Sequence, residues 1–451
     1  MKNHFDVIIV GAGPAGVSAA ICCLNEGLDT VLIDSKQKEM IGDKVCGEAI
    51  SKETSHQVSD LLKIQPPFGE EVNTNVKELV LQTVINQDHI VLPAIGYMVN
   101  RHKYGQRLLK NATDKGIELL DRTKAIRPII QNGKISGVVI KPWHKEEREL
   151  YAKIVIDCSG IRAKIRTSID DSVEPLLYTK LTPRDFAACY REIIELEEEH
   201  NLDGKIVLKY EKDIPEPGYI WFFADGEKKL NCGTGFIKDG KNKDKSVKEV
   251  YFSAMEKYYQ REKYIVLDGR GGSVPIQPPL WNAVAPGLLI AGDAAFHADP
   301  LTAEGHGPAL LAGCYAGQVA KDAIDKNRYS TEELWGYNRL IFSNFGSEHA
   351  RSRILAMVLE KLGASNLEFL LKRKVIKQSD LTSEGILKKN SICSLINRAV
   401  RCMPRIHLLI LIKRTIDISK NLAQLCGNYP ETPDKYVEWV KSVEKLYSRL
   451  N

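Results

Sequence analysis

The chain has 451 residues, of which 43% are hydrophobic and 27% are charged, a composition typical of a globular protein with a large core. Its 63 basic and 58 acidic residues leave a net charge of +5. This mild charge, without alternating basic and aromatic residues, does not indicate a nucleic-acid-binding protein. No apolar run reaches the roughly 18 residues that span a bilayer, and the ten cysteines form no CxxC pair or metal-ligand cluster. We therefore expect a cytoplasmic protein of two or three domains, without a signal peptide, metal site or iron–sulfur cluster.

The N-terminal segment predicts a dinucleotide-binding unit. An apolar strand, Asp6-Val-Ile-Ile-Val10, leads into Gly11-Ala-Gly13-Pro-Ala-Gly16 and a helix rich in small residues. The glycines permit a tight turn and a close approach of backbone to a pyrophosphate, toward which the helix N–H groups point. A second strand, Thr30-Val-Leu-Ile-Asp34, ends in an acid placed for a ribose hydroxyl. A glycine-rich turn without a ligand is the alternative, but the full order favours the dinucleotide site.

The next segment continues the alternation of helices and strands. Helical spacing from residue 103 to 115 ends at Gly116, as a glycine after a helix does, and strands are expected at 117–120 and 153–157. Two further strands, 126–130 and 135–140, flank Asn132-Gly133 and predict a hairpin.

Arg101 stands at the predicted start of the 103–115 helix, where the helix dipole disfavours a cation. Contact with the cofactor would explain that position, and a surface arginine is the alternative.

The second half of the chain changes character twice. Residues 176–270 are strand-like and aromatic, an apolar strand returns at 287–292 with a helix from Gly307, and residues beyond 330 are helical and basic. We predict an α/β fold in which a Rossmann-like cofactor domain receives an inserted β-rich substrate domain, followed by a helical region. The expected boundaries are 1–175 for the cofactor domain (with part of the substrate domain near 61–97), 176–270 for the substrate domain, 271–330 for the return segment and 331–451 for the C-terminal helices.

Two features of the return segment favour FAD over NAD. Gly292-Asp293 ends an apolar strand, and its acid can accept hydrogen bonds from a ribityl chain; an ordinary strand-ending turn is the alternative. In the stretch from Asp299 to Gly313, Gly305 and Gly307 permit close approach to a flat ring, and Pro308 suits a first helical turn. That helix N-terminus would face the edge of the flavin where negative charge collects on reduction.

His297 and His306 lie near the same predicted edge. We interpret them as neutral pocket histidines, with a proton relay as the alternative.

These segments resemble a known family. The N-terminal fingerprint, Ile156-Asp157-Cys-Ser-Gly160 and Gly292-Asp293 look like the flavoprotein hydroxylase superfamily. Ile41-Gly-Asp-Lys-Val-Cys46-Gly47-Glu48-Ala49 and Tyr219-Ile-Trp221-Phe-Phe223-Ala224, followed by Gly233-Thr-Gly235, resemble the geranylgeranyl reductase family, especially its archaeal members of the digeranylgeranylglycerophospholipid reductase type. The chain departs from the family pattern at Ala224, Val45, Glu304 and His306.

The resemblance implies reduction of C=C bonds in geranylgeranyl chains of isoprenoid or archaeal membrane-lipid precursors. The substrate would be a prenyl diphosphate or a geranylgeranylated glycerophospholipid, and the external electron donor a ferredoxin, NADPH or a deazaflavin. Carried over by position, Cys46, Tyr219 and Trp221 would form the catalytic set. FAD would be bound by Gly11, Gly13, Ala15, Gly16, Asp34, Cys46, Gly47, Ala49, Arg101, Ala125, Gly292, Asp293, Gly305 and His306.

Reduction of an isolated alkene requires an apolar tunnel, a dry surface over the flavin and a proton source. Tyr219, Trp221 and Phe223 alternate along one strand and can form an aromatic wall; an aromatic ladder in a sheet core is the alternative. Cys46 is either a thiol that guides the substrate or aids protonation, or a small packing residue.

Residues 397–420 combine basic side chains with the apolar run His407-Leu-Leu-Ile-Leu-Ile412. Such a segment can dock on an anionic lipid surface, which predicts peripheral contact with the inner face of the cell membrane. A buried helix with solvated ends is the alternative.

Two other functions stay open on the sequence alone. A flavin monooxygenase or halogenase could share the scaffold, and Tyr219-Ile-Trp221 resembles the Trp-x-Trp stretch of halogenases. An electron-transfer flavoprotein dehydrogenase is the third candidate, but its family needs an iron–sulfur module that this cysteine spacing does not supply.

Overall fold

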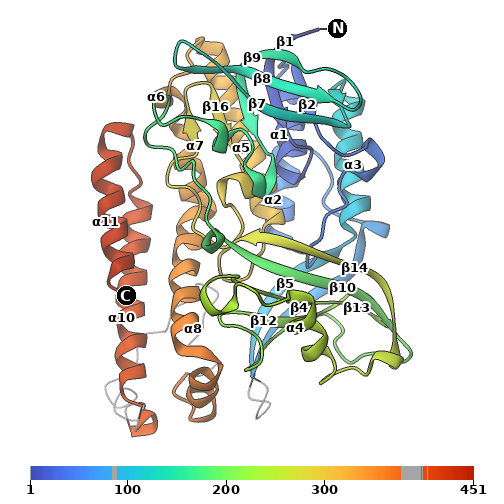
Figure 1. Ribbon diagram of the computed structural model, residues 1–451, viewed down its shortest axis with the longest axis vertical. Coiled ribbons are helices and arrows are strands. Elements are labelled where there is room, and N and C mark those ends of the chain that lie inside the picture. The colour runs from blue at the N-terminus through green and yellow to red at the C-terminus, as the bar shows by residue number, and fades with distance from the viewer. Residues whose placement is uncertain (1, 84–88, 377–397, 399, 404, 451) are drawn as a thin grey trace.

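Two eight-stranded sheets and a group of C-terminal helices make up the molecule (Figure 1). The computed structural model describes residues 2–83, 89–376, 398, 400–403 and 405–450. The predicted α/β fold with a β-rich second unit and a helical C-terminal region is confirmed by this arrangement. The domain boundaries stay a prediction.

In chain order, the strands are β1 His4–Val10, β2 Thr30–Ile33, β3 Ala49–Ser51, β4 Val72–Thr83, β5 His89–Val99, β6 Glu118–Leu120, β7 Thr123–Gln131, β8 Lys134–Pro142, β9 Arg148–Asp157, β10 Phe186–Leu196, β11 Lys205–Tyr210, β12 Tyr219–Ala224, β13 Lys229–Phe236, β14 Tyr264–Pro275, β15 Val284–Ala285 and β16 Leu288–Ile290. In chain order, the helices are α1 Pro14–Asn25, α2 Lys52–Leu62, α3 Arg101–Asp114, α4 Val247–Met255, α5 His306–Lys326, α6 Thr331–Leu334, α7 Gly336–Ile341, α8 Ser347–Lys372, α10 His407–Gly427 and α11 Tyr436–Ser448.

The first sheet has strand order β15-β16-β9-β1-β2-β6, and the β7–β8 hairpin joins it through β8 and β9. The pairs β1–β2, β1–β9, β9–β16 and β2–β6 are parallel. Their apolar residues are buried on both faces, as expected for a parallel sheet covered by helices. The predicted hairpin is confirmed, because Asn132 and Gly133 at its turn both have positive φ angles, as that type of turn requires.

Helices α1 and α5 cross closely on this sheet at a small residue. A Cβ atom on Gly313 of α5 would lie 2.1 Å from both the carbonyl oxygen of Ala15 and the Oγ of Ser18. The glycine therefore lets α5 approach α1 directly behind the first turn of α1, so that the N-termini of both helices lie at one edge of the sheet.

The second sheet has strand order β14-β10-β13-β12-β11-β4-β5-β3 and is antiparallel except for the β4–β11 pair. One face of β12 (Ile220, Phe222 and Ala224) is buried, and Ile220 and Phe222 belong to a separate core beneath helix α4. Helix α4 lies within the segment that the sequence indicated as strand-like. The opposite face of strand β12 carries Tyr219, Trp221 and Phe223.

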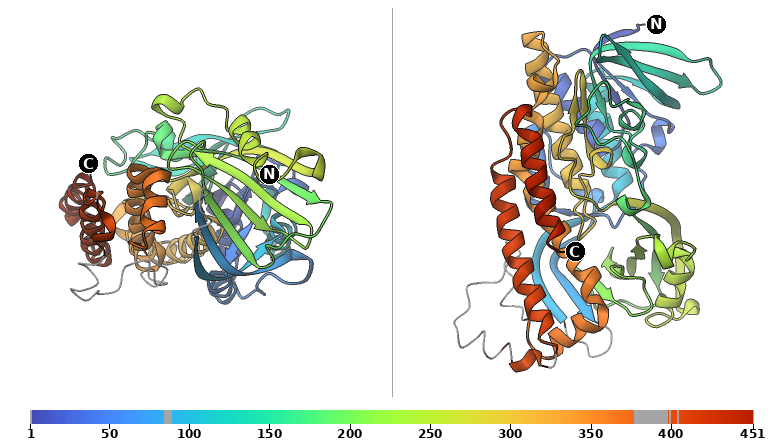
Figure 2. Two further views of the ribbon diagram at one scale, coloured as in Figure 1. Left: turned by 90° about the horizontal axis from the view of Figure 1, so that it is seen from below. Right: turned by 60° about the vertical axis from the view of Figure 1, so that its left-hand side comes forward.

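The C-terminal helices lie along one side of the molecule, with α8 between the two sheets and the α10–α11 pair (Figures 1 and 2). Their buried residues belong to the same core as the parallel sheet. A π-helical turn, Phe342–Gly346, joins α7 to α8.

We expect Gly313→Val to lower the free energy of unfolding by about 2–3 kcal/mol, the usual cost of overpacking a tight contact. The added carbons would push α5 away from Ala15 and Ser18. Chemical denaturation measures the change. Gly336→Ala is the matched control, because a Cβ atom at Gly336 meets nothing within 4 Å; equal losses in the two variants would contradict the close-crossing explanation.

Candidate active site

One continuous cavity of about 1760 Å³ runs from the β1–α1 turn to the second sheet and helix α8. This volume exceeds the roughly 300–1,000 Å³ of a pocket for one small ligand, so there is room for two ligands in contact. Every residue of the predicted catalytic and FAD-binding sets lines the cavity except Gly16. The sequence motifs, which extend from Gly11 to His306, therefore converge on one space.

The β1–α1 turn forms the end of the cavity that suits a pyrophosphate. Gly11 has φ +100°, and a Cβ atom on it would lie 2.3 Å from the carbonyl oxygen of Cys158. Gly16 lies behind the turn, where a Cβ atom would be 1.7 Å from the carbonyl oxygen of Gly11; its contribution is to helix–turn packing. Gly13 faces open space, and no side chain caps the N-terminus of α1. The free N–H groups of this helix end are a ready anion site.

Asp34 lies beside this turn at the end of β2. Its Oδ2 accepts a hydrogen bond from the backbone N–H of Ala12 at 2.7 Å, and its Oδ1 accepts one from Lys36 at 2.7 Å. The two backbone donors hold the carboxylate at the cavity wall, where it can still accept from a ribose hydroxyl.

Arg101 is the first residue of α3 and is only 6% exposed, yet its guanidinium has no hydrogen bond or ion pair within the described chain. A buried, unpaired cation is costly unless a ligand completes it. The Nδ1 atom of buried His306 likewise has no partner among the described residues. Both side chains line the cavity and fit a large polar cofactor better than an empty protein interior.

Both histidines near this edge are neutral at neutral pH. Burial, together with the positive charges of Arg101 and Lys44, holds the pKa of His306 well below its usual range. Burial lowers the pKa of His297 to about 3, and its Nδ1 accepts from the backbone N–H of Gly292 at 3.1 Å. His297 lies outside the cavity lining. These contacts favour neutral pocket histidines over the proton relay.

The loop before α5 brings two acids to the cavity. Asp293 pairs with Lys44, whose Nζ lies 2.5 Å from its Oδ2. Glu304 accepts a hydrogen bond from the backbone N–H of Gly307 at 2.9 Å, and burial raises the pKa of Glu304 to about 7. Gly305 is the N-cap residue of α5 and has no side chain to cap the helix, so Glu304 satisfies one of its first N–H groups instead.

The far half of the cavity is lined by an aromatic row, which we define as Tyr210, Tyr219, Trp221 and Phe223. Successive ring centroids are 5.8, 6.4 and 6.2 Å apart. None of these residues belongs to the core beneath α4. The interpretation as a cavity wall is thereby favoured over an aromatic ladder in the sheet core.

Glycines make space for the aromatic row. A Cβ atom on Gly233 of β13 would lie 2.2 Å from the Trp221 ring, and one on Gly47 would lie 2.7 Å from the Phe223 ring. Gly233 of the Gly233-Thr-Gly235 motif is therefore required sterically, because a side chain at this position would overlap the indole of Trp221.

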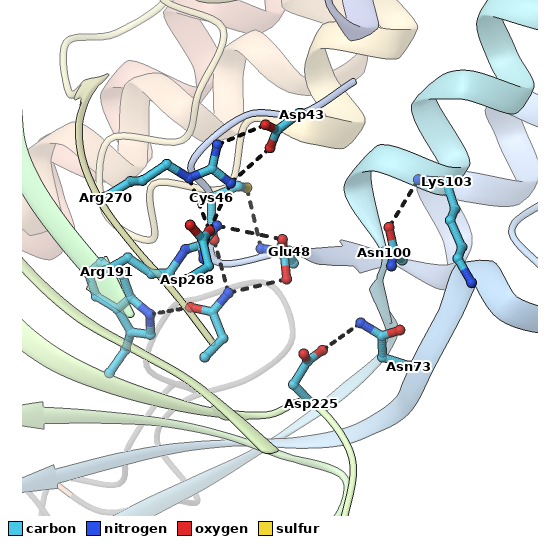
Figure 3. A network of polar contacts seen from close by, with 12 residues as sticks. Asp43, Cys46, Glu48, Asn73, Asn100, Lys103, Arg191, Asp225, Asp268 and Arg270 are labelled. Carbon is cyan, nitrogen blue, oxygen red and sulfur yellow. Dashed lines mark hydrogen bonds and ion pairs between the residues drawn. The ribbon is translucent and has the colours of Figure 1, made fainter. Parts of the chain in front are cut away.

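A polar network fixes the loop of residues 41–49, which we call the Cys46 loop (Figure 3). Asn231 of β13 accepts a hydrogen bond from Trp221 Nε1 at 3.1 Å and donates to the carbonyl oxygen of Cys46 at 3.0 Å. Arg270 of β14 holds Asp43 through two hydrogen bonds of 2.9 and 2.8 Å. The loop is thus anchored to the second sheet at Asp43 and at Cys46.

Sequence reasoning missed the network and the tyrosine at the end of the row. The available signal was Asn231, a polar residue between Leu230 and Cys232. Arg191 stands beside Glu192 in β10, so its burial had no such signal. Arg353, Ala356 and Leu359 of α8 also line the cavity, and nothing in their helical spacing distinguishes them from core residues.

Comparison with known proteins agrees with this geometry. The family model described as FAD dependent oxidoreductase matches residues 6–162. The digeranylgeranylglycerophospholipid reductase of Sulfolobus acidocaldarius is 30% identical over 99% of this chain and 98% of its own length. A solved geranylgeranyl bacteriochlorophyll reductase-like protein from Thermoplasma acidophilum superposes with a TM-score of 0.74 at 25% identity, over 91% of this chain and 99% of that one.

A flavin-dependent brominase superposes with a TM-score of 0.63 at 14% identity, covering 99% of this chain and all of the other. That likeness concerns the fold alone. The matched family and the glycine turn agree on FAD as the cofactor, and unpartnered Arg101 and His306 fit its polar atoms.

We expect Arg101→Met to weaken FAD binding about tenfold or more, the loss that follows removal of a charge-assisted hydrogen bond. Flavin fluorescence during titration of the apoprotein measures the affinity. Lys103→Met is the matched control on the same helix, because Lys103 is exposed and pairs with Glu70 at 2.6 Å. Unchanged affinity in Arg101→Met would show that the guanidinium does not contact the cofactor.

Proposed function

Because the chain belongs to the digeranylgeranylglycerophospholipid reductase family, we propose that it reduces C=C bonds in the geranylgeranyl chains of a membrane-lipid precursor with FAD. The observation that carries this proposal is the single cavity in which the FAD-binding end continues into an apolar, aromatic space. A long alkene chain lying there would reach the cofactor without passing through water.

The residues of the apolar half account for two needs of the reaction. The aromatic row and aliphatic neighbours such as Leu79, Ile206 and Leu208 exclude water from the reacting carbons. The ring faces of the row stabilise positive charge that develops on an alkene carbon during protonation. When bound and reduced, FAD supplies the hydride for the other carbon.

The positions of the charged groups at the FAD-binding end fit their proposed roles. The N-termini of α1 and α5 and the buried Arg101 place positive potential around the cofactor. That potential favours the pyrophosphate and the negative charge of the reduced ring. Cys46 lines the same cavity, and we propose that its thiol guides or protonates the geranylgeranyl chain.

We propose a geranylgeranylated glycerophospholipid as the substrate, because the Sulfolobus relative is a digeranylgeranylglycerophospholipid reductase. Ile95 of β5 is 69% exposed and also lines the cavity, so the cavity reaches the surface at β5. Arg353 of α8 lines it too and makes no hydrogen bond or ion pair within the described part of the chain, so its cation can pair with a phosphate of a head group or a diphosphate. The electrons would come from an external ferredoxin, NADPH or a deazaflavin.

The start of α10 and the residues just before it carry a surface suited to peripheral membrane contact. Its members, which we call the basic–apolar patch, are Val400, Met403, Ile406, Ile410, Lys413 and Arg414. Val400 and Ile410 are 66% and 65% exposed. The patch lies at the same lower end of the molecule as the outer ends of β4 and β5 (Figures 1 and 2), so a docked protein would receive its lipid at that end.

The sequence interpretation of this segment needs one correction. Arg398 was counted among the membrane-facing cations, but it is buried and donates a hydrogen bond to the carbonyl oxygen of Val375 at 3.0 Å. Asn397 lies outside the described residues. Helix α10 buries Leu408, Ile418 and Leu422, so only its outer stripe is available to lipid. Among the described residues, no helix has the length and apolar character of a membrane span.

The two other functions have less support. The brominase likeness is limited to the fold at 14% identity, whereas the reductase relative matches along nearly the whole chain. For a dehydrogenase that passes electrons to quinone, the described residues contain no group of His, Cys, Asp and Glu side chains that could hold a metal ion.

We expect the reduced holoenzyme, mixed anaerobically with digeranylgeranylglyceryl phosphate, to be reoxidised as the lipid gains mass in steps of two hydrogens. Dithionite reduces the FAD beforehand, flavin absorbance follows the reoxidation and mass spectrometry follows the lipid. A saturated analogue is the control. Reoxidation only after oxygen is admitted, with no gain of hydrogen, would favour a monooxygenase.

We expect the holoenzyme to sediment with vesicles that contain anionic lipid at low salt, and Lys413→Glu with Arg414→Glu to weaken this binding. Each basic residue near such a surface contributes about 1 kcal/mol, so the pair should cost at least tenfold in partition coefficient. Ile265→Ser on β14, which is 68% exposed, is the control for loss of an exposed apolar residue. Equal binding by wild type and the double variant would remove the patch from the proposal.

A further inference from the structure

A second, smaller cavity of about 330 Å³ lies behind the Cys46 loop and is polar in character. Its other walls come from β4, the turn after β12, β13 and β14, and include Asn73, Asp225, Lys229 and Asp268. The residues that line both cavities are Asp43, Glu48, Arg101, Arg191 and Arg270. A partition of charged side chains therefore separates the polar space from the large cavity.

Glu48 is the central carboxyl of this partition. It is 7% exposed, and its backbone has φ +71°, a left-handed conformation that a non-glycine residue adopts only when its surroundings enforce it. Its backbone N–H donates to the Cys46 Sγ at 3.3 Å. The strained turn thus places a buried carboxyl group two positions from the thiol that faces the large cavity (Figure 3).

The partners of Glu48 are loose. Asn231 Nδ2 donates to its Oε2 at 3.4 Å, and Arg191 Nη2 lies 3.8 Å from its Oε1. Arg191 makes its shorter contact, 2.7 Å, with Asp268 instead. The carboxyl of Glu48 is therefore not locked into a tight ion pair that would keep it permanently ionised.

Charged and titratable groups from every surrounding element line the small cavity with Glu48. They are Arg191 on β10, Asp268 and Arg270 on β14, Asp225 after β12, Lys229 on β13, Arg101 and His102 on α3, and Asp43 on the same loop. Burial outweighs the attraction of Arg191 and raises the pKa of Glu48 to about 7, with Asp225 contributing in the same direction. Near neutral pH, Glu48 can hold a proton and release it.

We propose that Glu48 supplies the proton consumed in the large cavity and is reloaded from water in the small cavity. The inference rests on the proposed reduction of C=C bonds, which consumes one proton and one hydride per bond. As a new C–H bond forms, the S–H bond of Cys46 breaks; the O–H bond of Glu48 then breaks to restore the thiol. The carboxylate of Glu48 takes its next proton from water, and the hydride with its two electrons comes from the reduced cofactor.

Glu304 is the competing donor, because burial also raises its pKa to about 7. It lines the large cavity alone, and its carboxylate accepts from the Gly307 N–H at the start of α5. His306 has no contact with the small cavity and is neutral at neutral pH. Of Glu304, His306 and Glu48, only Glu48 lines both the large and the small cavity.

The test is the pH dependence of single-turnover reoxidation of the reduced holoenzyme by digeranylgeranylglyceryl phosphate. In the wild type, we expect the rate to fall above about pH 7 as Glu48 loses its proton. Glu48→Gln should lower the rate about 100-fold, the size of a general-acid contribution, and abolish this alkaline limb. Glu48→Asp, which keeps the acid, should retain a limb at a shifted pH, and Glu304→Gln should retain the wild-type limb whatever its rate.

A wild-type limb in Glu48→Gln, or its loss in Glu304→Gln, overturns the inference. The absorption spectrum shows whether Glu48→Gln retains FAD. If it does not, the test rests on Glu48→Asp: a shifted alkaline limb in its pH–rate profile supports the inference, and an unshifted one overturns it. A wild-type enzyme that reduces no substrate at any pH contradicts the proposed function itself, so the two failures are distinguishable.

Discussion

The side-chain amide of Asn231 connects the parts of the active site that come from distant segments of the chain. It is fully buried, accepts from Trp221 and donates to the Cys46 carbonyl. One amide thus sets the position of the aromatic row relative to the loop that closes the FAD-binding end. A buried amide that lost either partner would leave unpaired polar atoms in a low-dielectric interior, so the loop and the row are restrained as one unit.

Close approach of backbone is the second constraint, and glycine meets it wherever a larger residue would separate two surfaces. Gly11 and Gly16 bring the turn against Cys158 and α1, Gly313 brings α5 against α1, and Gly233 admits the indole of Trp221. These contacts position two helix N-termini and one aromatic wall around a single space. The shape of the cavity therefore depends on the absence of side chains at these glycines as well as on the side chains that line it.

The sequence predicted the parts of the site that depend on local pattern. The β1–α1 turn, the Asn132-Gly133 hairpin and the alternation of Tyr219, Trp221 and Phe223 are each encoded within a few residues, so spacing alone indicates them. The network of Glu48, Arg191 and Asn231 is different, because its members are brought together by strand pairing across nearly two hundred positions. Burial of Arg398 against Val375 was also missed, because it too depends on a contact with another segment of the chain. Spacing within a segment indicates which face of a helix is apolar, but not which polar residue another segment will cover.

The continuity of the large cavity has a thermodynamic consequence for its two ligands. One unbroken space of about 1760 Å³ extends from Gly13 to Tyr210. If the cofactor and the lipid chain bind at its two ends as proposed, each would remove apolar surface of the other from water. We then expect cooperative binding, and by linkage the lipid would strengthen the cofactor's binding by the same factor as the cofactor strengthens the lipid's. Such an enzyme would hold its flavin most firmly while a substrate is bound.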